Sequence, residues 1–346
     1  MTGALPELSD SLSVDAAEVT RFLALRDPGF FDHEYRRNRP ELSVFIHARH
    51  HGRLVGTQGL VPYPLMIGGR PFMSGRTERA MVDPMWRTGG LFAQLMRSCA
   101  AQATDKGHDL LWGNTGARAP FQRNGFLFFT DYYEHALLCL APRRIVADLR
   151  APQPRQMRAA KLAIAVPSLS LRVAARGGRG RRFTFVSSAR GDRDVDQLYR
   201  SMQGKVPLVV MRHEPAFLDW LLHAPGRRVE RVYVYDGATL AAYAYVDLAG
   251  GTTATLVDFA ARDAGSMRAL IQRIARDLGQ RGVAFLYVSY NVTNPLLAQQ
   301  RRWLVLNGFV PFHRGGAFVV RALRFQDYNY LNDLSRWYIT RLWNEL

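Results

Sequence analysis

Two consecutive glycines stand between an arginine and an apolar segment in the stretch VDPMWRTGGLF, residues 82–92. Glycine is a poor helix former, so Gly89 and Gly90 cost helix stability unless a ligand must approach the backbone there. A helix N-terminus exposes unpaired N–H groups and carries a partial positive charge, and both attract phosphate. Arg87 adds a fixed cation close by. The stretch predicts a pyrophosphate-binding turn, and the alternative is an ordinary strand-to-helix turn.

Glu78 is the only acidic residue within the strand expected before this turn. A carboxylate beside a ligand-binding turn is a candidate for proton transfer. Alternation along a strand would place Glu78 on the same face as Ala80 and Val82. The alternative role for Glu78 is an ion pair with Arg76 or Arg79.

The elements that must position these residues follow from apolar periodicity and from glycine and proline punctuation. They are, in order, a helix over 14–38, strands over 42–84, a helix over 90–105, a strand over 109–115, a helix opened by Pro120 and closed by Asn124-Gly125, and a strand over 126–142. Alternating strands and helices of this kind predict an α/β unit.

The second half of the chain repeats the first in weaker form. Leu95 and Gly107 have counterparts 175 residues later, at Leu270 and Gly282, and the tripeptide Asn-Gly-Phe ends the following helix in both halves. A repeated order of elements indicates a duplicated unit. We therefore predict an N-terminal lobe over 1–142, a basic linker over 143–182 rich in Pro, Arg, Gly and Ala, and a C-terminal lobe over 183–346.

The net charge of +17 favours an anionic ligand or surface. The basic residues are spread along the chain and no nucleic-acid motif accompanies them, so nucleic acid is not an expected partner. Within the linker, residues 157–173 predict a short amphipathic helix, and the arginines beside it favour peripheral contact with an anionic membrane surface. A linker packed between the lobes is the alternative. These linker arginines are Arg155, Arg158, Arg172 and Arg176.

The composition also indicates the cellular compartment of the protein. The N-terminus lacks the basic start and apolar run of a signal peptide, and Cys99 and Cys139 suit a reducing compartment. We therefore expect a cytoplasmic protein. Neither the cysteines nor the histidines around residue 50 have the spacing of metal ligands, because strand alternation would direct those histidines to both faces. No metal site is predicted.

The chain resembles the GNAT acyltransferase superfamily, whose signature is Arg/Gln-x-x-Gly-x-Gly/Ala at the start of the helix after the fourth strand. Residues 87–92 carry that pattern, followed in order by a strand ending at Asn114 and a helix ending in Gly-Phe. The resemblance covers 14–140 well and 205–315 loosely. It looks closest to two-lobed members, including those encoded with bacterial surface-polysaccharide genes.

Three departures from the family pattern are visible. Phe92 stands in place of the last small residue of the signature, so the packing of helix against phosphate is relaxed there. Phe121 stands where many members have a tyrosine that protonates the departing thiolate. The second half offers Arg262 and Gly265 at the right gap but no glycine-rich loop, which predicts a single CoA per chain.

The resemblance implies tandem GNAT-like lobes, each a mixed, mostly antiparallel sheet flanked by helices, with acetyl-CoA between the splayed fourth and fifth strands of the first lobe. A backbone N–H near Val82 would polarise the thioester, and Glu78 would act as the base. Tyr132, Tyr133 or water would act as the acid. The residues expected to bind acetyl-CoA are Met81, Val82, Arg87, Thr88, Gly89, Gly90, Leu91, Phe92, Asn114 and Phe121.

The expected activity is therefore transfer of an acetyl group from acetyl-CoA to an amine of a small polar or sugar-like acceptor. Two alternatives stay open. One is an aminoacyl transferase built from two such lobes that uses aminoacyl-tRNA. The other is a non-catalytic binding module that keeps the fold as a scaffold. If Glu78 is not the base, Asp258 occupies the comparable strand of the second half.

Overall fold

The computed structural model describes residues 6–25, 27, 29–141, 183–191, 193–203 and 208–344. The predicted linker, its amphipathic helix and its arginines lie outside these residues, so contact with an anionic surface stays a prediction. None of the helices in the described ranges combines the length and the apolar character needed to cross a membrane.

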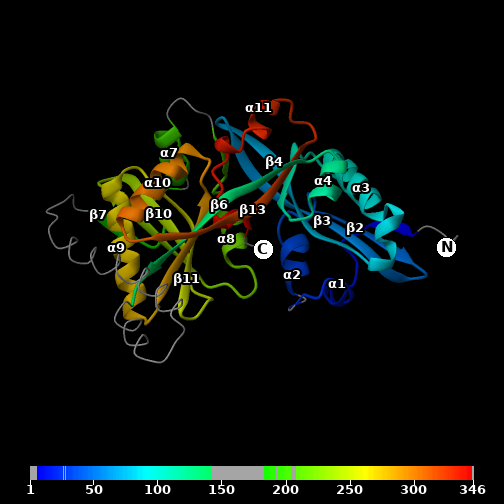
Figure 1. Ribbon diagram of the computed structural model, residues 1–346, viewed down its shortest axis with the longest axis horizontal. Helices are drawn as coiled ribbons and strands as arrows, with labels where there is room; N and C mark the ends of the chain where they lie inside the picture. Colours follow the sequence, from blue (N-terminus) through cyan, green and yellow to red (C-terminus); the bar gives the residue numbers. More distant parts are fainter. Residues whose placement is uncertain are drawn as a thin grey trace.

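One mixed sheet of 13 strands runs through the molecule in the order β1-β2-β3-β4-β5-β13-β6-β12-β11-β10-β9-β7, with β8 paired to β3 (Figure 1). The strands are β1 (Glu7–Asp10), β2 (Val44–His50), β3 (Arg53–Ile67), β4 (Arg70–Val82), β5 (Leu110–Asn114), β6 (Leu127–Cys139), β7 (Phe183–Val186), β8 (Val209–Met211), β9 (Val229–Asp236), β10 (Thr239–Asp247), β11 (Thr253–Ala261), β12 (Phe285–Asn291) and β13 (Val310–Ala322). Only the β4–β5 and β11–β12 pairs are parallel among the paired strands. The predicted α/β fold, mostly antiparallel and flanked by helices, is confirmed.

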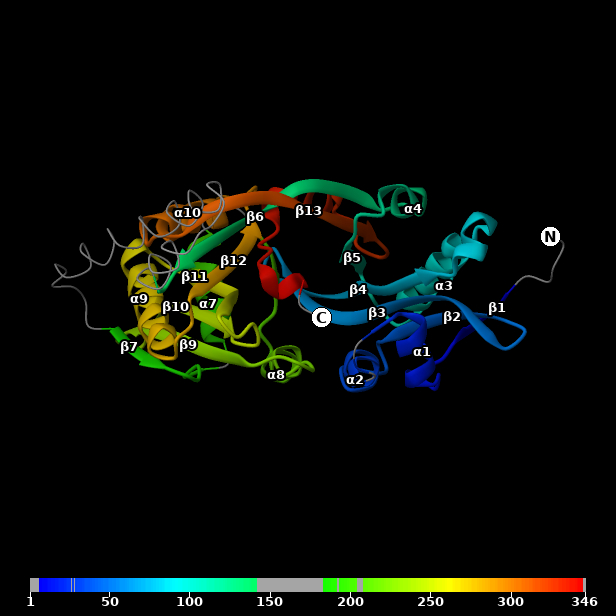
Figure 2. The ribbon, with the colours of Figure 1, turned by 60° about the horizontal axis from the view of Figure 1, so that its bottom comes forward.

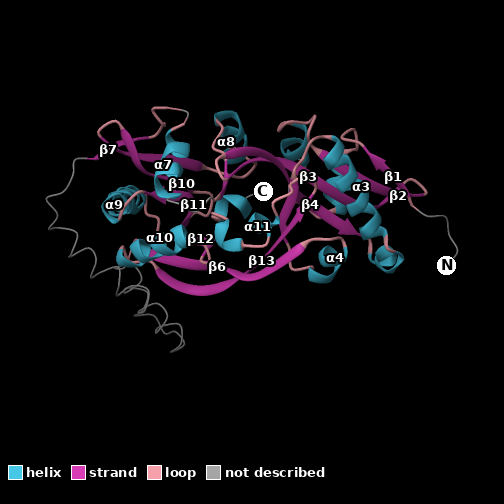
Figure 3. Ribbon diagram, turned by 90° about the horizontal axis from the view of Figure 1, so that it is seen from above, coloured by secondary structure: helices cyan, strands magenta, loops and turns pink. Residues whose placement is uncertain are grey.

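The two halves exchange their last strands. β13, from the second half of the chain, lies between β5 and β6 of the first half, while the other edge of β6 pairs with β12. Figure 3 shows β6 and β13 side by side along one edge of the molecule. The two predicted sheets are consequently joined into one continuous sheet.

Helices cover both faces of this sheet. They are α1 (Ala16–Phe22), α2 (Gly29–Phe31), the π-helix η1 (Asp32–Arg36), the 3-10 helix η2 (Pro84–Gly89), α3 (Leu91–Asp105), α4 (Arg118–Arg123), α7 (Asp194–Gln203), α8 (Pro215–Leu222), α9 (Ala264–Gln280), α10 (Pro295–Leu306), α11 (Tyr328–Leu331) and the 3-10 helices η4 (Leu334–Arg336) and η5 (Arg341–Asn344). α3 and α9 end at Asp105 and Gln280, 175 residues apart, as the sequence repeat predicts.

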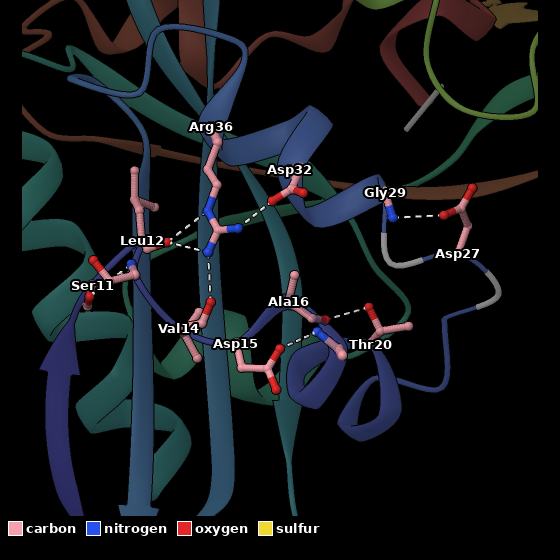
Figure 4. A network of polar contacts seen from close by, with 12 residues as sticks. Ser11, Leu12, Val14, Asp15, Ala16, Thr20, Asp27, Gly29, Asp32 and Arg36 are labelled. Carbon is pink, nitrogen blue, oxygen red and sulfur yellow. Dashed lines mark hydrogen bonds and ion pairs between the residues drawn. The ribbon is translucent and has the colours of Figure 1, made fainter.

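The single helix predicted over 14–38 is wrong, because the chain divides there into α1, α2 and η1. Ala24, with φ of 52°, takes the left-handed conformation just after α1. Arg36 then ties the returning π-helix to the N-terminal segment (Figure 4). Its guanidinium donates to the carbonyls of Leu12 and Val14 and pairs with Asp32 at 2.5 Å.

The first half has a separate core on each face of its sheet. On one face, Leu91 and Leu95 of α3 pack with Val44 and Ile46. On the other, Tyr35 of η1 belongs to a large core that continues into the second half. Figure 2 shows α3 on one side of β2–β4 and α1 and α2 on the other. The second half therefore packs on the face opposite α3.

α8 completes the junction between the halves. The indole of Trp220 stacks on His33 with ring centroids 5.1 Å apart and donates to the His33 carbonyl at 2.7 Å. His33 is 4% exposed, and burial, helped by the charge of Arg37, lowers its pKa to about 4. The imidazole is therefore neutral near pH 7.

We expect this histidine to make the protein less stable in acid. Unfolded chains protonate His33 below pH 6.5, while the folded chain does so only near pH 4, so the free energy of unfolding falls as the pH falls through that window. His33→Phe, which keeps the stacked ring, should remove up to about 1.4 kcal/mol of this loss per pH unit. Urea unfolding at pH 7 and pH 5 measures it. Equal pH dependence in His33→Phe and the wild type would contradict the assignment.

Candidate functional site

The fork between β4 and β5 is the centre of the candidate site. The two strands pair in parallel from Ser74↔Leu110 to Arg76↔Trp112, after which β4 runs on to Val82 while β5 pairs only with β13. A Cβ at Gly113 would meet Thr77 Oγ1 at 2.2 Å, so glycine permits the close approach at the base of the fork. Beyond it, a gap opens between the strands.

A bulge in β4 sets the direction of the side chains at the gap. Glu78 pairs with Gly59 and Met81 with Thr57, so Arg79 and Ala80 lie opposite Gln58 alone. Arg79 has φ of 57°. The expected alternation is therefore wrong here, because the extra residue places Glu78 and Val82 on opposite faces.

A buried ion pair accompanies the bulge. Arg79 Nε donates to Glu34 Oε2 at 2.8 Å, and a second guanidinium nitrogen pairs with the other carboxylate oxygen. Glu34 is fully buried, and burial raises the pKa of its carboxyl against the opposing effect of Arg79. The pair fixes the side chain of Arg79 on the π-helix and so holds the bulged conformation.

The backbone of the gap offers a donor at Val82. The N–H of Asp83 donates to Val55 O at 2.9 Å, on the β3 side. Successive amides of a strand point to opposite sides, so the N–H of Val82 is directed toward β5. Its neighbour Met81 is half-buried, and the side chain of Val82 packs into the core with α3.

The turn that follows is open to a ligand. η2 is capped by Asp83, whose carboxylate accepts from Met85 N at 3.0 Å, and α3 begins after Gly90, at φ of 74°. No side chain caps α3 and no acidic residue lies in its first turn. A Cβ on Gly89 or Gly90 would have no heavy atom within 4 Å. These features give a helix N-terminus that an anion can approach.

The other residues predicted for this turn surround its open side. Arg87 is exposed, and its Nε donates to Val82 O at 3.1 Å. This hydrogen bond holds the guanidinium group next to the gap. Thr88 is exposed, while the side chain of Leu91 is buried under α3. The residues predicted from the signature are thus gathered at one end of the gap.

Phe92 and Phe121 pack against each other beside this turn. Their ring centroids lie 5.5 Å apart, and Phe121 also contacts Phe126 edge to face at 5.1 Å. Phe121 is 3% exposed. Phe92 therefore contacts α4, and both rings belong to the core under α3.

A pocket of about 610 Å³ lies at the end of β5, beside the paired strands β6 and β13, and we call it the polar pocket after its polar side chains. Gly316 of β13, at φ of 85°, and Asp131 of β6, at φ of 54°, form facing bulges there. The bulge allows the adjacent Tyr132 and Tyr133 both to be buried. The pocket is lined by Asn114, Thr115, Gly116, Thr130, Asp131, Tyr132, Tyr133, His135, Gly316, Ala317 and Arg341.

The two tyrosines have different partners. Tyr132 donates its hydroxyl proton to Asn114 Oδ1 at 2.7 Å, at the tip of β5. Tyr133 donates to the carbonyl oxygen of Thr340, in the C-terminal segment. The structure therefore brings Tyr132 and Asn114 together beside the gap, while Tyr133 connects the pocket to the second half.

Glu78 is ion-paired with Arg76, at 2.5 Å between Oε1 and Nε. Arg76 is itself buried, donates to the Tyr63 hydroxyl at 3.1 Å and lies over the ring of Trp112. Trp112, Tyr132 and Tyr133 belong to the same core. Glu78 thus lies on the face of the sheet that carries the tyrosines, outside the lining of the polar pocket.

Several pocket residues escaped the sequence analysis. Asp131 lines the pocket from an exposed bulge, and the pKa of His135 is lowered by burial and by the nearby His313 and Arg341. Arg341 comes from a segment more than 200 residues away along the chain. No local pattern signals these positions, except that an aspartate in the middle of a strand, here Asp131, is unfavourable and is compatible with a bulge.

In the second half, β11 and β12 also part after a short parallel pairing, but the N-terminus of the following helix, α9, is capped. The carboxylate of the N-cap residue Asp263 accepts a hydrogen bond from Ser266 N at 2.9 Å. In return, the hydroxyl oxygen of Ser266 accepts a hydrogen bond from Asp263 N. Arg262, the counterpart expected from sequence, pairs with Asp236 at 3.0 Å. A carboxylate thus occupies the place that is open at Gly90, and it repels a pyrophosphate.

Comparisons with known proteins agree with this geometry. The family model of the acetyltransferase (GNAT) domain matches residues 14–126. No curated protein sequence matches the chain. Among solved structures, a probable N-acyltransferase from Enterococcus faecalis aligns with a TM-score of 0.62 and 10% identity, over 94% of this chain and 74% of that one.

Two further structures are similar. A GCN5-related N-acetyltransferase from Kribbella flavida has a TM-score of 0.55 and 14% identity, over 92% of this chain and 72% of that chain. N-myristoyltransferase from Saccharomyces cerevisiae, solved with bound myristoyl-CoA, has a TM-score of 0.54 and 12% identity, over 92% and 83%. At these identities the likeness concerns the fold. Residues 14–126 therefore match the GNAT acetyltransferase domain, and the chain has the fold of these GNAT structures.

Proposed function

We propose that this protein is an N-acetyltransferase that moves an acetyl group from acetyl-CoA to an amine of a small polar acceptor. The observation that carries the proposal is the uncapped start of α3, with two open glycines and Arg87, at the end of the gap between β4 and β5. Backbone N–H groups, the helix dipole and a guanidinium together suit a pyrophosphate. Asn114, at the tip of β5 on the other side of the gap, lines the pocket that contains the two tyrosines.

The residues of the gap suit a direct acyl transfer. The N–H of Val82 would donate to the thioester oxygen, where negative charge develops during attack. The acceptor nitrogen forms the new bond to the carbonyl carbon, and the carbon–sulfur bond breaks. Glu78 takes the proton of the amine, and Tyr132, beside Asn114 at the tip of β5, supplies the proton of the thiolate while regaining one from solvent.

The lining of the pocket supports a polar acceptor. Its side chains are hydroxyl, amide, carboxylate, imidazole and guanidinium groups together with the two tyrosine rings, and large aliphatic side chains are missing among its lining residues. An acceptor that combines hydroxyl groups with an apolar ring face, such as an amino sugar, would find both hydrogen-bond partners and aromatic surface there. A long acyl or alkyl acceptor would leave these polar groups unpaired.

Gly89→Val should abolish tight CoA binding. Gly89 lies in open space and lacks the positive φ of Gly90, so valine adds bulk on the ligand side with little backbone strain. Arg87→Ala should weaken binding by about 1.5–3 kcal/mol, as for a charge-assisted hydrogen bond. Calorimetry with CoA should give one site per chain in the wild type.

The matched control is Gly279→Val, at an equally open glycine on α9, which should leave CoA affinity unchanged. Unaltered affinity in both Gly89→Val and Arg87→Ala would refute the binding turn. Two equivalent sites in the wild type would refute the closed second half.

Glu78→Gln should lower the turnover number by about 10²–10⁴, the typical contribution of a general base, with CoA affinity retained. Thiol release from acetyl-CoA with glucosamine, lysine, ethanolamine and spermidine as acceptors measures it. Asp131→Asn is the informative comparison, because Asp131 is the carboxylate among the residues that line the pocket. A loss in Asp131→Asn with full turnover in Glu78→Gln would move the base to Asp131.

A further inference from the structure

The C-terminal segment, residues 337–343, is buried in the middle of the molecule. Trp337, Ile339 and Trp343 are at most 1% exposed. Figure 2 shows this segment, in red, between the two halves. A segment buried this deeply has a defined binding position in the fold, which we call its seat.

That seat is the fork of the second half. β11 and β12 pair in parallel from Thr253↔Phe285 to Leu256↔Val288, and β11 then runs on to Ala261. The register with β10 shifts just beyond this point, between Tyr245 and Val246. A parallel pair that ends early, with a bulge in the longer strand, is the arrangement of β4 and β5 in the first half.

The C-terminal segment contacts both strands of this second fork. The N–H of Asn291, at the end of β12, donates to Ile339 O at 2.8 Å, and Tyr290 bridges to Thr340. On the other side, the hydroxyl of Tyr338 donates to Phe259 O of β11 at 2.8 Å. The segment therefore fills the gap that corresponds to the open one in the first half.

Thr340 connects this filled gap to the polar pocket. Its Oγ1 donates to Asp258 Oδ1 at 2.7 Å, and Asp258 also accepts from Tyr243 at 2.7 Å and contacts His213 Nε2 at 2.9 Å. The carbonyl of the same Thr340 accepts the hydroxyl proton of Tyr133. One residue thus spans from a buried carboxylate of the second half to a pocket tyrosine of the first.

We propose that Thr340 is a positioning residue, which acts through Tyr133 to shape the acceptor pocket, and that the C-terminal segment is the permanent occupant of the second fork. The second half then serves as the wall of the acceptor site, with Asp258 as its anchor. The expected change in KM rests on the proposed acetyl transfer. The position of the C-terminal segment in the second fork does not depend on that activity.

Thr340→Val tests the proposal, since it removes only the hydroxyl that bonds Asp258. We expect the KM for the fastest amine of the panel above to rise about tenfold, with CoA affinity within twofold of the wild type. Tyr133→Phe should raise the KM similarly, and the double variant should be no worse than Tyr133→Phe alone. Hydrogen exchange should be slow at the amides of Tyr338 and Asn291 in the wild type and faster in Thr340→Val.

Thr20→Val is the control, because Thr20 Oγ1 donates to Ala16 O at 2.7 Å in α1, away from both forks. An unchanged amine KM in Thr340→Val, or a loss of CoA affinity equal to the change in KM, would overturn the positioning role. Rapid exchange at Tyr338 and Asn291 in the wild type would overturn the seat. The exchange measurement on the wild type needs no turnover. It therefore tests the position of the segment even if none of the amines is acetylated or if Thr340→Val fails to fold. The absence of acetylation by itself counts against the proposed function and not against the position of the segment.

Discussion

The exchange of β6 and β13 is the constraint on which the rest of the molecule depends. Each of these long strands pairs with a strand of the other half, so the ladder β5-β13-β6-β12 joins both halves through backbone hydrogen bonds. An unpaired backbone group inside a protein is costly, so neither half can close its own sheet without the other. The facing bulges at Asp131 and Gly316 interrupt the antiparallel pairing of these two strands, and both residues line the polar pocket.

The two forks of the sheet have similar strand pairing, but different groups lie beside them. A parallel pair that parts leaves amides and carbonyls of both strands without their ladder partners. In the second half, the carbonyl of Ile339 and the hydroxyl of Tyr338 take up two of these groups, and Asp263 caps the helix at the end of the fork. In the first half, the start of α3 has no side-chain cap and two open glycines. The second fork thus holds a segment of the chain itself, whereas the helix start at the first fork is left open.

The sequence predicts the features that depend on neighbours along the chain. The turn at Arg87, the start of α3 and the strand ending at Asn114 follow from local chemistry, and the common ends of α3 and α9 follow from the repeat. The side of β4 on which Glu78 lies could not be predicted, because alternation fails where Arg79 takes a positive φ. That conformation is fixed by Glu34, a buried partner 45 residues away, and no spacing rule signals such a pair.

The strand exchange and the seat of the C-terminal segment escaped prediction for a related reason. β13 has a similar apolar pattern whether it pairs within its own half or with β5, so periodicity alone does not choose between the two. The aromatic residues near the C-terminus predict only that the segment packs on the body. The positions of Thr340 and Arg341 in the candidate site are therefore consequences of long-range pairing, in which the entropy of closing a long loop is offset by many contacts formed together.

The corresponding acidic residues of the two forks illustrate how such a duplication diverges. The side chain of Glu78 is 15% exposed and has one ion pair, with Arg76. Asp258, on the corresponding strand, is 2% exposed and has its two oxygens engaged by Thr340, Tyr243 and His213. A carboxylate with that many partners in a closed core has no room for an incoming amine, whereas one at a half-open fork retains access to it. The two carboxylates therefore differ in their surroundings, because the C-terminal segment binds Asp258 in the second fork, whereas Glu78 at the first fork is paired with Arg76 of its own strand.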